Sequence, residues 1–494
     1  MNFIKRFSSK INKNDWTIIV AILSLFLAFC TPQAFAESLV GKGGEQRIAA
    51  ENFPGDDIGA QINAAVVALN QESGIITVTT PGEISTPVQL GVGQILEFGP
   101  GIWQCSAAPA ITLDNASQVI GAGVFLTKLI LDPSSMGPLL QSKDFSRLAS
   151  KSEAELATEN HSLAGDYKSL PGVKYIRIRG LTLYGDKNNH STPANGIEIF
   201  GLWYWLEDLS IENFSGDGLV TQFITAAEVT GNDAMESYFT NIKLLNNVGN
   251  GWTLKGPHDS IISGVISARN GGWGIDVMHE NGYYSGGGAM FTNTHLYGNK
   301  MGLRTAPGAN ILAFGLESEA NKGVGLLLRS NDSVIQGIFY ANGTYGIQIG
   351  EQSMYAGANV LNVQVHNNHL AQINWESSGG YNTLYGSIYP MEGQKYFELP
   401  PTRFDQVLTA GPQNPSTTAS QYFPGGIQFD NEGNINGIKN LSSSYQNQIS
   451  FLETRLALLE KKSAIAIGIL FIIAVACIAY VIINRIKGQK TLQR

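Results

Sequence analysis

The sequence predicts an all-β solenoid, a stack of coils in which short strands alternate with tight turns. Between Tyr238 and Ile349 one pattern recurs: an apolar strand ends near an Asn, a glycine turn follows, and a second strand opens with Gly and an apolar residue. The opening glycines, starting at Gly196, are separated by 22, 33, 23, 28, 23 and 21 residues. A strand-and-turn repeat in the twenties, without helical runs, is typical of a β-solenoid.

The composition agrees with one long β domain plus accessory segments. The chain has 494 residues and is 43% hydrophobic, which is enough to bury a large core. Its 56 glycines and its low charge of 15% suit many tight turns. The net charge of −8 argues against nucleic acid as a partner, because such binding needs a basic face. Cys30 and Cys477 lie in apolar terminal segments, so Cys105 has no partner for an intrachain disulfide.

Residues 1–36 have the features of a secretory signal peptide. A basic start is followed by an apolar run from Thr17 to Phe29, and Ala34-Phe35-Ala36 offers a cleavage site between small residues. We expect cleavage there, with an uncleaved anchor as the alternative.

The solenoid domain is expected over residues 45–390 and opens with a capping helix. Asp56 or Asp57 can cap a short helix in which Ile58, Ile62 and Ala65 share one face. Such a helix would cover the open end of the solenoid, where apolar side chains and unpaired strands would otherwise meet water.

Motifs in this first part of the domain resemble a known family. They are Ile62-Asn63-Ala64-Ala65, Gly74-Ile75-Ile76, Pro100-Gly101-Ile102-Trp103 and Ile120-Gly121-Ala122-Gly123. Their order resembles the opening of pectate-lyase-superfamily proteins, which include pectate lyases, rhamnogalacturonase- and polygalacturonase-like hydrolases, alginate C5-epimerases and phage tailspikes. The resemblance implies a right-handed, single-stranded parallel β-helix and a polysaccharide as ligand.

The C-terminal part of the sequence predicts a stalk that leads to a membrane anchor. Residues 391–437 are polar and rich in Pro, as a linker would be. Residues 438–462 contain a short heptad pattern, which predicts a coiled coil and a homo-oligomer, with a lone helix as the alternative. The pattern is carried by Tyr445, Ile449, Leu452, Leu456 and Leu459.

Residues 464–483 carry no charge and are long enough to cross a bilayer as a helix. The basic tail at 484–494 follows, so the positive-inside rule places it in the cytoplasm. The sequence therefore predicts a single-pass protein of the cell membrane. Its β-helix lies outside, in the periplasm or in the extracellular space.

Aligning the second strands on their opening glycines predicts which side chains share a face. The residue after each glycine should point inward, and the next residue outward. The expected inward set is Ile197, Leu219, Trp252, Ile275, Leu303, Leu326 and Ile347, and the outward set is Glu198, Val220, Thr253, Asp276, Arg304, Leu327 and Gln348. Asp276 should therefore lie beside Arg304, with Lys255 one coil away and His279 just past the strand.

These four residues are the candidate catalytic site. Removing the proton beside a uronate carboxylate requires a cation to neutralise the carboxylate and a base to take the proton. Arg304 suits the first role, and Lys255 or His279 the second. Asp276 would orient the base or help to bind Ca²⁺, and no other cofactor is expected. The alternative is a plain surface ion pair between Asp276 and Arg304.

A local match adds to this hypothesis. The segment from Trp273 to Glu280 is similar to the aromatic-Gly-aliphatic-Asp-Pro-His motif of alginate C5-epimerases, although it lacks the Pro and has one extra residue before His279. Tyr283 and Tyr284 follow, and aromatic rings of this kind stack on sugars. The candidate substrate-binding residues are Glu198, Arg329, Tyr283 and Tyr284.

The function hypotheses remain open between two classes. The first is a membrane-anchored protein that binds or acts on polysaccharide, as a uronate lyase, a C5-epimerase or a glycoside hydrolase. The second is a non-catalytic adhesion, surface-structure or carbohydrate-binding module, which could assemble as a tailspike-like trimer. The recurring Asn246, Asn270, Asn299, Asn321 and Asn342 are interpreted as scaffold, because stacked amides bond coil to coil.

Overall fold

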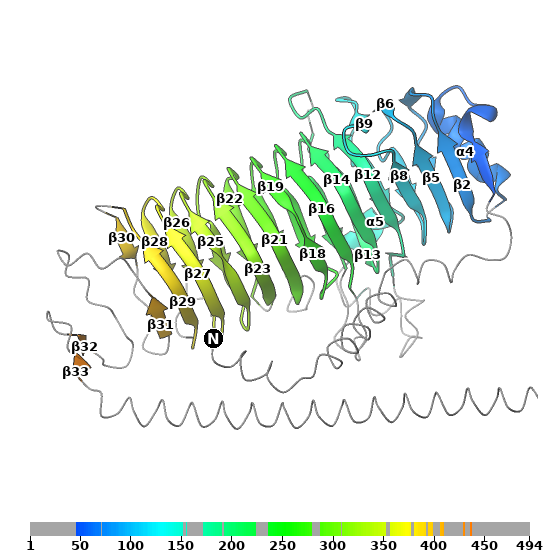
Figure 1. The fold of residues 1–494 in the computed structure, drawn as a ribbon. Coiled ribbons are helices and arrows are strands. Elements are labelled where there is room, and N and C mark those ends of the chain that lie inside the picture. Colours follow the sequence, from blue (N-terminus) through cyan, green and yellow to red (C-terminus); the bar gives the residue numbers. More distant parts are fainter. Residues whose placement is uncertain are drawn as a thin grey trace, which may run out of the picture.

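The chain forms a parallel β-solenoid of about 11 turns. The computed structural model describes residues 46–398 apart from 71, 152–154, 156–170, 190–191, 224–235, 279–286, 308, 352–355, 377–379 and 392–393, together with short strands at 406–409, 428–429 and 435–436. Successive coils lie side by side in chain order, from blue to yellow in Figure 1. The predicted all-β solenoid is confirmed.

Each coil contributes to two long sheets, and every pairing within them is parallel. Sheet A has 18 strands and sheet B has 13 among the described residues. The strands of sheet B are β4 (Val88–Gln89), β7 (Ile111–Leu113), β10 (Leu140–Ser142), β11 (Val173–Lys174), β13 (Ile197–Leu202), β15 (Leu219–Gln222), β17 (Trp252–Lys255), β20 (Trp273–Val277), β22 (Met301–Thr305), β24 (Leu326–Leu328), β26 (Tyr345–Ile349), β28 (Ala371–Trp375) and β30 (Lys395–Phe397).

Sheet A contains the longer strands. They are β1 (Arg47–Ala49), β2 (Gly74–Val78), β3 (Glu83–Ile84), β5 (Gln94–Phe98), β6 (Gly101–Cys105), β8 (Gln118–Gly121), β9 (Thr127–Leu131), β12 (Arg177–Tyr184), β14 (Trp205–Glu212), β16 (Tyr238–Leu245), β18 (Ile261–Ser263), β19 (Ile266–Ala268), β21 (Ala289–Tyr297), β23 (Ile311–Glu319), β25 (Val334–Tyr340), β27 (Val360–His366), β29 (Thr383–Tyr389) and β31 (Gln406–Thr409). The short strands β32 (Gln428–Phe429) and β33 (Ile435–Asn436) pair with each other in antiparallel fashion.

A line of left-handed residues bends sheet A along its length. These residues, which we call the bend line, are Gly180, Asp208, Asn241, Gly264, Asn293 and Gly315, with φ between 50° and 70°. Two consecutive residues of β16, Thr240 and Asn241, are exposed at this point, so the in-out alternation of the strand restarts there. Glycine and asparagine are favoured because they tolerate positive φ. The bend divides sheet A into two walls.

The core is one continuous stack of apolar side chains inside the coils. All seven residues predicted to point inward from sheet B, Ile197, Leu219, Trp252, Ile275, Leu303, Leu326 and Ile347, are fully buried. Cys105 is also buried and is a free thiol. The stacked coils therefore build the core of the described residues from apolar side chains.

Helices are few. The described residues contain η2 (Ala50–Asn52), α4 (Ile58–Ala68) and α5 (Phe145–Ala149). The helix α4 lies at the end of the sheets where the chain enters (Figure 1). Asp57 caps it by accepting a hydrogen bond from the backbone N–H of Ala60 at 2.6 Å, and Ile62 and Ala65 are buried. Its role as a cover for the solenoid end stays a prediction.

A buried amide ladder ties the coils together. It runs through Asn247, Asn270, Asn299, Asn321, Asn342, Asn368 and Gln372, with Nδ2 of each Asn donating to the side-chain oxygen of the next residue at 2.9–3.2 Å. The predicted set of stacked asparagines was wrong at one residue: Asn247, not Asn246, is the first residue of the ladder. Asn246 takes φ of 57°, and this turns the following residue inward.

Within the described part of the chain, no helix is long and apolar enough to cross a membrane. The predicted signal peptide (1–36), coiled coil (438–462), membrane helix (464–483) and tail (484–494) lie outside the described residues. In the segment 391–437, read from the sequence as a linker, β30 pairs with β28 and β31 with β29.

Candidate functional site

The outer face of sheet B carries a cluster of charged side chains on β17, β20 and β22. The strand register sets Asp276 opposite Thr253 on one side and opposite Arg304 on the other. This is the placement that the glycine alignment predicted. Arg304 donates two hydrogen bonds to Asp276, from Nε to Oδ1 at 2.7 Å and from Nη2 to Oδ2 at 2.5 Å. The pair is therefore bidentate and fixed in orientation.

The pair is more enclosed than a surface ion pair. Asp276 is only 2% exposed, although its column faces outward. The Arg304 side chain is 28% exposed, and its guanidinium lies 5.2 Å from the centre of the Trp273 ring, a cation–π distance. A buried carboxylate is costly without a cationic partner, and Arg304 supplies that partner to Asp276. The exposed surface ion pair considered from the sequence does not describe this geometry.

Asp217 belongs to the same cluster and was missed by the sequence reading. It precedes β15 and accepts two hydrogen bonds, from Thr253 Oγ1 at 2.5 Å and from the backbone N–H of Asn250 at 2.7 Å. Burial raises the pKa of Asp217, and the negative charge of Asp276 raises it further, against the lowering effect of its hydrogen bonds and of Lys255. Asp217 thus retains its proton to higher pH than an ordinary aspartate.

A signal for Asp217 was present in the sequence. It stands directly before Gly218, one of the glycines that open the second strands, just as Asn195 stands before Gly196 and Asn250 before Gly251. In the structure each of these three side chains accepts a hydrogen bond from the backbone N–H of a residue in the next coil. Extending the alignment by one residue toward the N-terminus would have found the carboxylate.

Lys255 ends β17, two residues after Thr253, and lies in register with Gln222 of β15. Its charge acts on Asp217, whose pKa it lowers. The structure therefore places Lys255 and Asp276 where their charges act on Asp217, and it pairs Arg304 with Asp276. The fourth predicted catalytic residue, His279, lies outside the described residues, as do Tyr283 and Tyr284.

The other two predicted binding residues lie on the same face but apart from this cluster. Glu198 is three coils from Asp276 in register, about 14 Å at the usual strand spacing. It accepts hydrogen bonds from Gln141 at 2.7 Å and from Asn195 at 2.8 Å. Arg329 follows β24 and forms an ion pair with Glu351 at 3.6 Å. Both have protein partners that fix them.

Arg304 bonds both carboxylate oxygens of Asp276, and binding of Ca²⁺ at this residue stays a prediction. A different group on sheet A has the residue types of a metal site. His295, Glu317 and Glu319 place ligand atoms within 4.8 Å of one another. All three have protein partners, since His295 Nε2 lies 3.1 Å from Glu319 Oε1 and the Tyr340 hydroxyl donates to Glu317 at 3.0 Å.

Comparisons with known proteins identify the fold. A family model described as "Right handed beta helix region" matches residues 225–388. No curated protein matches the chain by sequence. Among solved structures, the A-module of mannuronan C-5 epimerase AlgE4 from Azotobacter vinelandii is similar at 16% identity and a TM-score of 0.50, covering 74% of this chain and 94% of that one.

Two further structures are similar at lower scores. The A-module of mannuronan C-5 epimerase AlgE6 from Azotobacter vinelandii has 14% identity and a TM-score of 0.41, covering 74% of this chain and 100% of that one. The tailspike protein 2 enzymatically active domain of bacteriophage CBA120 has 12% identity and a TM-score of 0.37, covering 74% and 47%. The family model and the AlgE4 A-module thus agree on a right-handed parallel β-helix, the fold that the resemblance implied.

Proposed function

We propose that the protein binds an acidic polysaccharide along the outer face of sheet B. The observation that supports this most is the fixed guanidinium of Arg304, which is held by Asp276 and by Trp273. Lys255 adds a second basic side chain on the same face, two coils away on β17. Two cations on one regular wall match carboxylates that recur along a uronate chain. While Asp217 holds its proton, Lys255 and Arg304 against Asp276 give the cluster a net charge of +1.

A second candidate function is uronate lyase or C5-epimerase activity at the same place. The raised pKa of Asp217 is the observation that favours it, since perturbed carboxyl groups beside cations are typical of acid–base chemistry. In this scheme Arg304 neutralises the substrate carboxylate through Nη1. Lys255 is the base predicted from the sequence, and loss of the C5 proton passes the electron pair to the carboxylate. In a lyase the C4–O bond then breaks and the leaving oxygen takes a proton from water, whereas in an epimerase C5 is protonated again from the opposite face. Asp276 positions Arg304 and does not touch the sugar.

The cellular setting is part of the proposal. A cleaved signal at 1–36 and a membrane helix at 464–483 would place the β-helix outside the cell membrane, with the tail at 484–494 in the cytoplasm. The heptads at 438–462 would join copies of the chain, and α4 would shield the end of the solenoid.

The test is incubation of the full-length protein with polygalacturonate, polymannuronate and polyguluronate, with and without Ca²⁺. Retained binding by calorimetry, without change in the polymer, supports the binding function. Absorbance from unsaturated sugars, or an altered uronate ratio by NMR, supports the second candidate. Absence of binding to all three polymers contradicts both.

Replacing Lys255 by Ala should weaken binding of the preferred polyuronate about tenfold, because a charged hydrogen bond contributes roughly 1.5–3 kcal/mol. Isothermal titration calorimetry at fixed ionic strength measures this. The matched control is Lys243→Ala, a lysine on the outer wall of sheet A. Equal affinity of the two variants would remove Lys255 from the site.

Asp217 should make binding and stability depend on pH. Its folded-state pKa is raised, so its contribution to stability is fully present below the ordinary value of 3.8 and is lost as pH rises through the raised value. Polyuronate affinity should fall over the same interval, because ionised Asp217 cancels one cation. Asp217→Asn should flatten both profiles in thermal melts and titrations, and an unchanged profile would contradict this assignment.

A further inference from the structure

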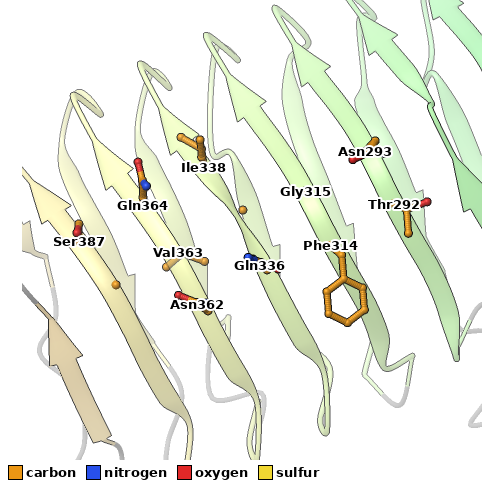
Figure 2. Close-up of a pocket in the computed structure, with 12 residues that line it drawn as sticks. Thr292, Asn293, Phe314, Gly315, Gln336, Ile338, Asn362, Val363, Gln364 and Ser387 are labelled. Atoms are coloured by element: carbon orange, nitrogen blue, oxygen red, sulfur yellow. The ribbon is translucent and has the colours of Figure 1, made fainter. Parts of the chain in front are cut away.

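A second ligand-sized feature lies on sheet A, away from the charged cluster. It is a groove of about 730 Å³ that crosses β21, β23, β25, β27 and β29 (Figure 2). The residues that line it are Thr292, Asn293, Phe314, Gly315, Gln336, Gly337, Ile338, Asn362, Val363, Gln364, Gly386 and Ser387. Neighbouring coils are about 4.8 Å apart, so the first and last of these strands are separated by about 19 Å. The groove thus has the length of an extended oligomer.

The bend line creates this groove. Gly315 has φ of +70°, and the strands on either side of it form two walls that meet at an angle. Gly337 and Gly386 lie in the same part of later coils, where a Cβ would collide with the carbonyl oxygens of Leu316 and Val363. At Gly315, Gly337 and Gly386 the floor of the groove is therefore backbone without a side chain, whereas Asn293 contributes a side chain at its first coil.

The walls carry uncharged polar side chains in register. Gln336 lies opposite Asn362 on the wall before the bend, and Gln364 lies opposite Ser387 on the wall after it. None of the twelve lining residues is charged. Each amide offers both donors and an acceptor, as sugar hydroxyls also do. Gln336 and Asn362 thus lie one coil apart on one wall, and Gln364 faces the groove from the other wall.

An apolar patch accompanies the amides. Phe314 is 42% exposed and Ile338 is 37% exposed, one on each side of the bend. Figure 2 shows the Phe314 ring standing out from its strand beside Gln336. Exposed apolar side chains among a few placed polar groups are typical of small-molecule and sugar sites. An aromatic ring offers a flat surface for the C–H face of a pyranose.

We propose that this groove binds a neutral polysaccharide whose chain runs parallel to the solenoid axis. Acidic glycans are disfavoured because Glu317 lies in register with Ile338, and Glu319 lies two residues further on. A peptide is disfavoured because sheet A presents its face here, with the strand backbones already paired, and β-addition needs a free edge. The proposal rests on the proposed function only in taking polysaccharide as the ligand class.

The chain then has two binding faces with opposite preferences. The cluster around Arg304 on sheet B suits uronates, and the groove on sheet A suits uncharged hexoses. A polymer that contains both kinds of sugar, or two different polymers, could engage both faces at once. Each face can be tested without disturbing the other because they lie on different sheets.

The test is calorimetric titration of the full-length protein with neutral hexasaccharides of glucose (β-1,4, α-1,4 and β-1,3 linked) and of β-1,4-mannose, and with hexagalacturonate. We expect at least one neutral hexasaccharide to bind. The double variant Gln336→Ala/Asn362→Ala and the single variant Phe314→Ala should each weaken that binding about tenfold. The groove-filling variant Ser387→Trp should abolish it.

Matched controls are Gln104→Ala and Phe125→Ala, which alter an exposed glutamine and an exposed phenylalanine outside the groove. They should leave binding unchanged, and circular dichroism should show all variants folded. Lys255→Ala should affect hexagalacturonate only, so failure of the sheet B site is distinguishable from failure of the groove. The proposal is overturned if no neutral hexasaccharide binds, if the groove variants bind as well as the controls, or if they change only the oligomeric state.

Discussion

Arg304→Met should lower the free energy of unfolding by about 3–5 kcal/mol, because it leaves the carboxylate of Asp276 buried without its cation. Asp276 is 2% exposed, and both of its oxygens bond Arg304. Methionine preserves most of the aliphatic length, so lost packing contributes little. Urea denaturation followed by circular dichroism measures the change.

Arg177→Met is the matched control for this prediction. Arg177 bonds Glu207 across neighbouring strands at 2.5–2.8 Å, but 35% of its side chain and 24% of its partner's are exposed. Loss of such an exposed ion pair lowers the free energy of unfolding by about 1 kcal/mol or less. The double variant Arg304→Met/Asp276→Leu should regain most of the loss, because it removes both charges. If Arg304→Met costs no more than Arg177→Met, the enclosed pair is not the anchor of the sheet B site.

Asn299→Leu should lower the free energy of unfolding by about 3–5 kcal/mol, as Arg304→Met does, because it interrupts the amide ladder between Asn270 and Asn321. Asn299 accepts hydrogen bonds from the backbone N–H and the side chain of Asn270, both at 2.9 Å. It also donates to the carbonyl oxygen of Ser267 at 2.9 Å and to Asn321 at 3.2 Å. The backbone N–H of Asn270 would lose its side-chain acceptor, while Asn270 Nδ2 would keep its bonds to Leu244 and Ser267. Denaturation midpoints and amide hydrogen exchange at Asn270 measure the loss.

Asn362→Ala is the comparison for the ladder. This asparagine lies on the exposed outer face of β27, where a substitution changes stability by about 0.5 kcal/mol or less. If amide hydrogen exchange in Asn299→Leu is faster only in the coils that flank residue 299, the result would support coil-to-coil stacking as the source of stability. If Asn299→Leu and Asn362→Ala lower the free energy of unfolding by similar amounts, the hydrogen bonds of the ladder contribute no more to stability than apolar contacts at the same positions would.

The sequence predicted the sheet B neighbours correctly because a solenoid converts sequence alignment into spatial register. Once the opening glycines were aligned, Asp276 had to lie beside Arg304, and Trp252 had to point inward. The inference needed only the strand period of two and the parallel stacking of coils. No loop conformation entered into it.

Other features depended on local backbone geometry that the alignment does not contain. The choice of Asn247 over Asn246 for the ladder depends on the positive φ of Asn246. The groove depends on the bend line, whose glycines and asparagines look like ordinary turn residues in the sequence. The burial of Asp276 and the raised pKa of Asp217 depend on how neighbouring coils enclose them. These are properties of packing, not of spacing.

The most direct test of the sheet B site is a crystal structure of the full-length protein soaked with hexagalacturonate or with the preferred hexauronate. The account predicts a sugar chain across β17, β20 and β22, with carboxylates at Arg304 Nη1 and Lys255 Nζ. It also predicts that Lys255→Ala crystals lose that density under the same soak. Density for the uronate in the sheet A groove, or none on sheet B at saturating ligand, would contradict it.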